Sequence, residues 1–267
     1  MSILSFFKPR PEMPPAPARS VRCEICGAQA GFLGEVDFNK SCEEANGTFL
    51  PPAGRMVEYF LCDVCNFCFA PEFRNWTLDE FVEKIYNEDY VKVDPEYKFD
   101  RPDGNAALVH ALFGAHKQAI RHLDYGGGSG LLSSKLRENG WNSQSFDPVV
   151  DCDKAAGGLG TFNFITAFEV FEHVPDVNAL ADQLAKLCSD DGMIMFSTVC
   201  TDGHIGRGKD LSWWYAAPRN GHISLFSHEG LKQLMTKRGL SLYAISTVHY
   251  VAFRSVPPWS GLAIPGQ

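Results

Sequence analysis

The stretch that decides the fold, residues 119–130, reads AIRHLDYGGGSG. Its first part, Ala119–Leu123, is a short, largely apolar run that predicts a buried β-strand. Three glycines then follow with one residue between each, namely Gly126, Gly128 and Gly130. Glycine adopts positive φ and lets a ligand approach the backbone without a Cβ in the way. Because Leu131–Asn139 has a helical pattern, the stretch predicts a strand, a tight turn and a helix in that order.

Strands and helices alternate on the C-terminal side of this turn. Further strands are predicted at 141–146, 164–168, 192–198, 240–246 and 249–254. Helices are predicted at 177–188 and 227–238. Alternation of this kind favours parallel pairing and right-handed crossovers. The sequence therefore predicts an α/β protein with a doubly wound, Rossmann-like sheet, in which ligands bind outside the carboxyl ends of the strands.

Two carboxylates accompany the glycine turn. Asp124 ends the first strand, where its side chain can hydrogen-bond the loop or a cationic ligand. Asp147 ends the second strand, the position from which an acidic residue contacts ribose hydroxyls in nucleotide-binding folds. A structural interpretation remains for each feature: the glycines can form a tight turn without a ligand, and Asp147 can cap the turn before Pro148.

Two segments give this region a family resemblance. The Asp-x-Gly-x-Gly-x-Gly pattern from Asp124 to Gly130 resembles motif I of class I S-adenosylmethionine-dependent methyltransferases, whereas dinucleotide enzymes prefer Gly-x-Gly-x-x-Gly. Residues 162–174, FNFITAFEVFEHV, resemble the matching segment of ubiquinone-biosynthesis O-methyltransferases, with Asn163 and Phe171 as departures. The resemblance covers roughly residues 119–250. It implies S-adenosylmethionine as cofactor, with these binding residues: Asp124, Gly126, Gly128, Gly130, Asp147 and Glu169.

One connection is shorter than in that family. Only about 14 residues separate Asp147 from Phe162, where the family has a helix and a third strand that contacts adenine. Asp151, Asp153 and the glycine-rich bend 157–160 are the candidates for that contact, and an open adenine pocket is the alternative.

Two histidines are candidate general bases for methyl transfer to a hydroxyl, because the ordinary pKa of histidine lies near neutrality. His173 follows the third strand, and His222 lies in a segment, residues 213–227, that resembles the substrate side of the same family. The Glu-x-x-Glu-His pattern also resembles a divalent-cation site made by Glu169, Glu172 and His173. The structural alternatives are a turn cap at His173 and a buried, hydrogen-bonded anchor at His222.

Four cysteines form two Cys-x-x-Cys pairs separated by 35 residues: Cys23, Cys26, Cys62 and Cys65. Two such pairs predict a structural zinc site with four thiolate ligands, as in a zinc ribbon. Cys42 and Cys68 lie close enough in sequence to replace a ligand. The alternative is that the cysteines are free and fill a small core.

The composition limits the remaining function classes. The net charge is −8, which disfavours general nucleic-acid binding because phosphates attract dense Lys and Arg. No apolar run is long enough to predict a membrane span or a signal peptide. Nine cysteines without a secretory signal favour a reduced, cytoplasmic protein.

These patterns divide the chain into five predicted parts. They are a flexible N-terminal segment (1–20), a zinc-ribbon-like module (21–72), a helical connector or lid (73–115), a methyltransferase domain (116–256) and a C-terminal tail (257–267). In the connector, Thr77 and Glu80 predict a capping box, and Asn105–Phe113 predicts a second helix after the break at Arg101-Pro102.

The predicted function is S-adenosylmethionine-dependent methyl transfer to a hydroxyl of a small molecule, such as a sugar or another hydroxylated metabolite. One alternative is an RNA base methyltransferase, since certain ribosomal RNA enzymes also carry an N-terminal zinc module. The other is a degenerate domain that serves only as a binding module. The oligomeric state is left open.

Overall fold

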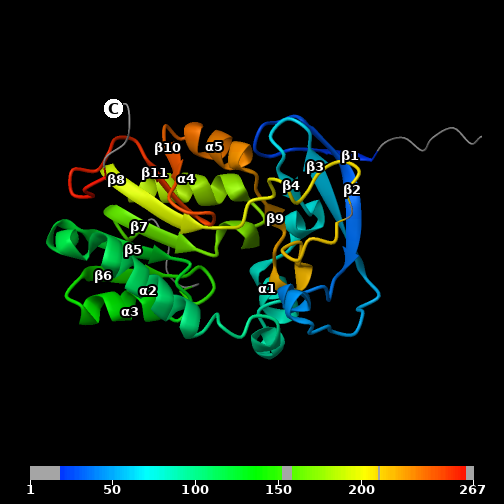
Figure 1. Ribbon diagram of the computed structural model, residues 1–267, viewed down its shortest axis with the longest axis horizontal. Helices are drawn as coiled ribbons and strands as arrows, with labels where there is room; N and C mark the ends of the chain where they lie inside the picture. Colours follow the sequence, from blue (N-terminus) through cyan, green and yellow to red (C-terminus); the bar gives the residue numbers. More distant parts are fainter. Residues whose placement is uncertain (1–18, 152–157, 210, 263–267) are drawn as a thin grey trace, which may run out of the picture.

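The computed structural model describes residues 19–151, 158–209 and 211–262. Two sheets lie side by side along its long axis (Figure 1). The expectations for residues 1–18, Asp153, Gly157 and 263–267 fall outside the described residues.

The larger sheet has six strands in the order β10-β11-β8-β7-β5-β6. Neighbours among β6, β5, β7 and β8 pair in parallel, while β11 is antiparallel to β8 and to β10. The strands are β5 (Arg121–Tyr125), β6 (Asn142–Phe146), β7 (Phe162–Phe168), β8 (Cys188–Ser197), β10 (Ser241–Ala244) and β11 (His249–Phe253). The predicted Rossmann-like, doubly wound α/β sheet is thereby confirmed.

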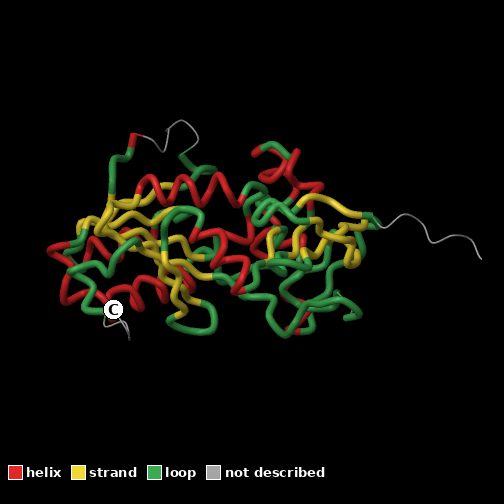
Figure 2. Tube along the Cα trace, turned by 90° about the horizontal axis from the view of Figure 1, so that it is seen from above, coloured by secondary structure: helices red, strands yellow, loops and turns green. Residues whose placement is uncertain are grey.

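Helices cover both faces of this sheet (Figure 1). One face carries α2 (Asp100–Phe113) and α3 (Leu131–Glu138), and the other carries α4 (Val177–Leu187) and α5 (His228–Thr236). The view from above shows these strands as one group and those of the smaller sheet as another (Figure 2). The carboxyl ends of the parallel strands point toward the space between the two sheets (Figure 1).

Helix α2 begins five residues before the predicted start at Asn105. The prediction treated Arg101-Pro102 as a break. Pro102 instead occupies the first turn of α2, where a backbone N–H has no intrahelical acceptor and its loss costs little.

The smaller sheet has five antiparallel strands in the order β1-β2-β3-β4-β9. They are β1 (Ser20–Arg22), β2 (Gln29–Asp37), β3 (Met56–Cys62), β4 (Cys68–Phe69) and β9 (Ser224–Leu225). Its last strand, β9, comes from the C-terminal part of the chain and pairs Leu225 with Cys68. The predicted boundary at residue 72 remains a prediction, but the N-terminal sheet is completed by a segment far beyond it.

Short helical segments fill the connections. Within the described residues they are α1 (Leu78–Lys84) and six 3-10 turns: Cys42–Asn46, Pro71–Asn75, Glu88–Lys92, Gly114–Ala119, Phe171–His173 and Pro218–Asn220. The capping box predicted at the start of α1 is confirmed, because Thr77 accepts from the Glu80 N–H and the Glu80 carboxylate accepts from the Thr77 N–H. Within the described ranges, no helix has the length and apolar character needed to span a bilayer.

One apolar cluster links the two sheets. It contains Cys62 from β3 and Phe67 from the turn before β4, together with Phe196 from β8, and all three are buried. Phe226, which follows β9, packs on Phe67 with a ring-centroid distance of 5.1 Å. The two sheets therefore share a core.

Candidate functional site

The glycine turn lies at the carboxyl end of β5, as predicted. Gly126 has φ +73°, and a Cβ there would lie 2.5 Å from Val170 Cγ2, so no larger residue fits. Gly128 has φ +52° but open space around it, which leaves its backbone accessible to a ligand. Gly130 instead begins α3 at its N-cap.

A cavity of about 1150 Å³ opens beside this turn. Its lining includes six of the predicted site residues: Asp124, Gly126, Gly128, Asp147, Glu169 and His173. Gly130 and His222 are not among its lining residues. Small-molecule sites usually measure roughly 300–1,000 Å³, so this cavity is large enough for a cofactor and a second molecule.

Asp147 performs the capping role and also contacts the glycine turn. Its Oδ1 accepts hydrogen bonds from the N–H groups of Val149 and Val150, at 2.8 and 3.2 Å. Its Oδ2 accepts from the Gly128 N–H at 2.9 Å. The carboxylate therefore fixes the turn and still lines the cavity.

Asp124 is almost completely buried, with 3% of its surface exposed. Its Oδ1 accepts a hydrogen bond from the Thr166 hydroxyl at 2.8 Å. Burial raises the pKa of Asp124 from 3.8 to about 7, and the nearby Asp147 carboxylate acts in the same direction. The group therefore changes charge near neutral pH.

Glu169 has a left-handed backbone, with φ +53°. Such a conformation is uncommon for a residue other than glycine, and it persists where the surroundings impose it. Here the Ser197 hydroxyl donates to Glu169 Oε1 at 2.7 Å and accepts from the Glu169 N–H at 3.0 Å. Both contacts hold the residue at the cavity wall.

The two histidines lie together, but only His173 lines the cavity. Their ring centroids are 4.9 Å apart. Burial lowers the pKa of His173 to about 4 and the pKa of His222 well below 6.5, so both rings are neutral at pH 7. His222 is buried behind His173, and its Nδ1 lies 3.0 Å from the Tyr215 carbonyl oxygen.

A candidate cation site adjoins the cavity, but its residues differ from the set that the sequence predicted. Ligand atoms of Glu172, His173 and His222 lie within 4.8 Å of one another, whereas Glu169 does not belong to this group. Glu172 Oε2 and His173 Nδ1 are buried and have no hydrogen-bond partner among the residues that the structure describes. Two neutral imidazoles and a carboxylate suit a divalent transition metal, so the residues present fit such an ion.

Arg101 is a cavity residue that the sequence did not predict. Its guanidinium donates to both carboxylate oxygens of Asp94, at 2.7 and 2.9 Å. The same part of the wall carries the rings of Tyr86, Tyr90 and Tyr97. A basic residue in the first turn of the helix that precedes the glycine-turn strand was the available signal, but Arg101-Pro102 was interpreted as a helix break.

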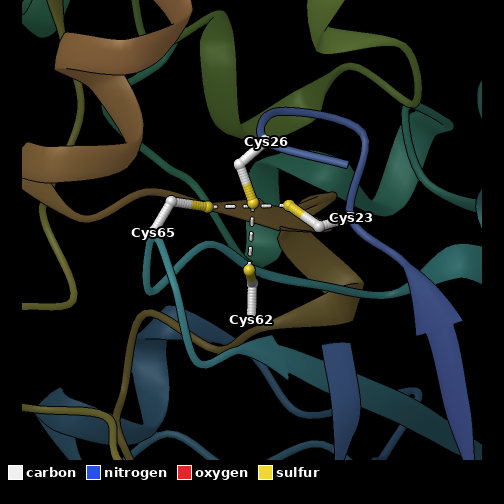
Figure 3. A group of neighbouring side chains, drawn as sticks. All are labelled: Cys23, Cys26, Cys62 and Cys65. Atoms are coloured by element: carbon white, nitrogen blue, oxygen red, sulfur yellow. Dashed lines mark hydrogen bonds between the residues drawn. The ribbon is translucent and has the colours of Figure 1, made fainter. Parts of the chain in front are cut away.

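The two Cys-x-x-Cys pairs converge at the edge of the N-terminal sheet (Figure 3). The Sγ atoms of Cys23 and Cys65 are 3.6 Å apart, and those of Cys26 and Cys62 are 3.3 Å apart. Tetrahedral zinc with bonds of about 2.3 Å places its sulfur ligands about 3.8 Å from one another. The hydrogen bond from the Cys65 thiol lowers the pKa of Cys23 to about 5. The four thiols therefore fit a zinc ion.

Neither alternative ligand belongs to this cluster. Cys68 is buried in the N-terminal sheet, where burial raises the pKa of its thiol. Cys42 Sγ lies 3.6 Å from His222 Nδ1, away from the four-cysteine cluster.

The geometry agrees with the comparison to known families. A family model described as a methyltransferase domain matches residues 97–245. This chain belongs to the methyltransferase domain family. The predicted resemblance to methyltransferases is thus confirmed.

Two curated relatives are ubiquinone biosynthesis O-methyltransferases. The one from Colwellia psychrerythraea is 28% identical over 100 residues, covering 29% of this chain and 41% of that protein. The one from Neisseria meningitidis is 43% identical over 47 residues, covering 18% of this chain and 20% of that protein. In both cases the similarity spans less than half of the relative's length.

Solved structures similar to this chain include two bound to S-adenosylhomocysteine. The 1,6-didemethyltoxoflavin-N1-methyltransferase of Burkholderia thailandensis has a TM-score of 0.45 and 15% identity, covering 76% of this chain and 95% of that chain. The magnesium protoporphyrin IX methyltransferase of Synechocystis PCC 6803 has a TM-score of 0.43 and 15% identity, covering 69% and 98%.

Proposed function

We propose that this methyltransferase transfers the methyl group of S-adenosylmethionine to a hydroxyl of a small molecule. The observation that carries the proposal is one cavity whose wall includes the glycine turn, Asp147 and His173 together. The glycine turn and Asp147 suit a nucleoside, and His173 suits an acceptor whose proton must be removed.

The cofactor end of the cavity is the glycine turn. The Asp147 carboxylate has lone pairs left for ribose hydroxyls after its contacts with the turn. Asp124 offers a carboxylate to the cofactor's ammonium group, and Arg101 keeps guanidinium N–H groups for its carboxylate. When bound, the cofactor supplies a sulfonium methyl as the electrophile, and the chain's task is alignment.

The acceptor end is the wall that carries His173 and the aromatic side chains. Tyr86 packs against His173 with a ring-centroid distance of 6.1 Å. Tyrosine rings present apolar faces with polar tips, a combination that suits a hydroxylated ring such as a sugar. His173 is neutral and lines the cavity, so its imidazole can accept the acceptor's proton. His222 lies behind it and can orient the His173 ring.

Zinc at the four-cysteine cluster belongs to the same proposal in a structural role, because four thiolates leave no open coordination position. Free thiols throughout the described residues suit the reducing cytoplasm. A divalent cation held by Glu172, His173 and His222 would supply Lewis-acid stabilisation of an acceptor oxygen. In that role His173 would be a ligand rather than a base.

Labelled methyl transfer tests the proposal. We expect the wild type to label members of a panel of sugars and phenols incubated with methyl-labelled S-adenosylmethionine. His173→Ala should lower turnover by roughly 10²- to 10⁴-fold, the usual contribution of a general base, while the affinity for S-adenosylhomocysteine changes little. Asp147→Ala should show the opposite pattern, with weakened cofactor binding.

Metal analysis distinguishes the two roles of His173. A base role predicts that chelation leaves turnover unchanged and that His222→Ala is much milder than His173→Ala. Equal losses in both variants, accompanied by loss of a bound divalent ion, would show a ligand role. Absence of S-adenosylhomocysteine binding at millimolar concentration would refute the proposed function.

A further inference from the structure

A chain of hydrogen-bonded polar side chains crosses the parallel sheet beneath α3. Its members are Asp124 and His122 on β5, Thr166 on β7, Ser143 on β6, and Ser133 and Arg137 on α3. All of them except Arg137 are buried. Burying this many polar groups costs free energy unless each has a hydrogen-bond partner.

The register of the sheet brings these side chains to one face. His122 is paired with Ser143 and Asp124 with Thr166, and paired residues of parallel strands project to the same side. His122 therefore bridges its two neighbours: its Nδ1 lies 2.7 Å from Ser143 Oγ and its Nε2 lies 3.0 Å from Thr166 Oγ1.

Which group donates in each hydrogen bond follows from the carboxylate at one end of the network and the cation at the other. Thr166 Oγ1 donates its single proton to Asp124, so it must accept from His122 Nε2–H. Burial lowers the pKa of His122 to about 3, so the ring is neutral and Nδ1 carries no proton. Ser143 must then donate to His122 Nδ1.

The other end gives the same direction. The Arg137 guanidinium can only donate, and it donates to Ser133 Oγ at 2.9 Å. Ser133 in turn donates to Ser143 Oγ, 2.8 Å away, because the Ser143 proton is already directed to His122. All five hydrogen bonds therefore point from the cation on α3 to the carboxylate at the cavity. Hydrogen bonds aligned in this way strengthen one another.

We propose that this chain is a positioning network that keeps the Asp124 carboxylate ionised and oriented for a cationic cofactor. The inference rests on the proposed function, because it takes the ammonium group of S-adenosylmethionine as the partner of Asp124. Asp124 touches the ligand, whereas His122 and Thr166 act through it. The other charged groups on the elements packed around Asp124 are Asp147 after β6, Glu169 after β7, and Lys135 and Glu138 on α3.

The network is tested at Thr166, because Thr166→Val removes the hydroxyl at nearly constant volume. Calorimetry with S-adenosylhomocysteine is carried out from pH 5.5 to 8.5. We expect wild-type affinity to rise with pH, with a midpoint near pH 7, and to level off above about pH 8 as Asp124 loses its proton. Thr166→Val should weaken binding by roughly tenfold or more at pH 7 and move the midpoint to higher pH.

Two control variants separate positioning from general stability. Thr166→Ser keeps the hydroxyl and should restore the wild-type midpoint. Thr201→Val removes another buried threonine hydroxyl, which donates a 3.5 Å hydrogen bond to the Asn66 carbonyl oxygen and takes no part in the network. It should leave the midpoint unchanged. A wild-type affinity and midpoint in Thr166→Val would overturn the proposed network.

A second measurement does not depend on cofactor binding. Nitrogen-15 NMR of the ligand-free protein should find His122 as the Nε2–H tautomer, and Thr166→Val should change its signals. Finding the Nδ1–H tautomer instead would contradict the donor-to-acceptor order of the hydrogen bonds in the network. If the wild type has the Nε2–H tautomer but does not bind S-adenosylhomocysteine, the hydrogen-bonded network would stand. The proposed cofactor and its link to the network would then be overturned.

Discussion

At the scale of one residue, Asp124 serves the proposed cofactor site but lowers the stability of the folded protein when it is ionised. Its pKa rises from 3.8 to about 7 because the carboxylate loses its hydration on burial. The folded state therefore binds the proton more tightly than the unfolded state. The resulting contribution to stability is present below pH 3.8 and is lost as the pH rises through about 7.

Asp124→Asn should therefore stabilise the protein at pH 8 while weakening the cofactor site. The shift sets an upper limit on the order of 4 kcal/mol for the stability gained, at 1.36 kcal/mol per pKa unit. Thermal unfolding at pH 5 and pH 8 checks the first effect, and titration with S-adenosylhomocysteine checks the second. Asp190→Asn, at a fully exposed side chain, is the control and should change neither. A lower melting temperature at pH 8 for Asp124→Asn would contradict this account.

Residues at or just beyond the carboxyl end of a strand in the parallel sheet were the ones that the sequence could predict. Asp124, Asp147 and His173 line the cavity because the carboxyl ends of parallel strands meet at one edge. His122 was overlooked because a histidine inside an apolar run gives no signal of its own. Its partners come from two other strands, and only the register identifies them.

At the scale of elements, periodicity predicted most helices and strands of the larger sheet with ends within a few residues. Helix α5, for example, runs from His228 to Thr236 with Ser227 as its N-cap. The two-residue strand β9 could not be predicted, because two residues carry no periodicity. Its pairing depends on contacts with β4, about 150 residues earlier in the chain.

Helix α1 gives a test at this scale. Thr77→Ala removes the hydroxyl that accepts the Glu80 N–H, which should destabilise the helix by about 1 kcal/mol. Because Leu78 and Phe81 of α1 line the cavity, the acceptor KM should rise while cofactor affinity stays constant. Amide hydrogen exchange of α1 measures the first effect and steady-state kinetics the second. Thr77→Ser is the matched control, and unchanged exchange in Thr77→Ala would refute the role of the cap.

At the scale of the whole molecule, hydrogen bonds to the backbone around the cysteine cluster connect distant parts of the fold. The Ser227 hydroxyl, at the start of α5, donates to the carbonyl oxygen of Cys65. Asn178 of α4 donates to the carbonyl oxygen of Glu24 at 2.9 Å, and Lys237 donates to that of Ile25. The cluster thus connects the N-terminal sheet to the helices on one face of the larger sheet.

Loss of zinc should therefore lower the stability of the entire chain. We expect one zinc ion per chain in the wild type and none in Cys62→Ser, which should unfold in a single transition at lower temperature. Cys188→Ser replaces a buried cysteine outside the cluster and should retain the metal. Atomic absorption and calorimetry provide both readouts. Two separate unfolding transitions would show instead that the N-terminal sheet folds independently.

The late position of β9 has a consequence for the nascent chain on the ribosome. All four cysteines of the cluster have been synthesised by residue 65, but the strand that pairs with β4 arrives only at Ser224–Leu225. Until then β4 is an open sheet edge, and open edges invite pairing with other chains. Early metal binding would keep the two Cys-x-x-Cys turns folded until β9 has been synthesised. A shortage of zinc should therefore reduce the yield of newly made protein before it affects molecules that are already complete.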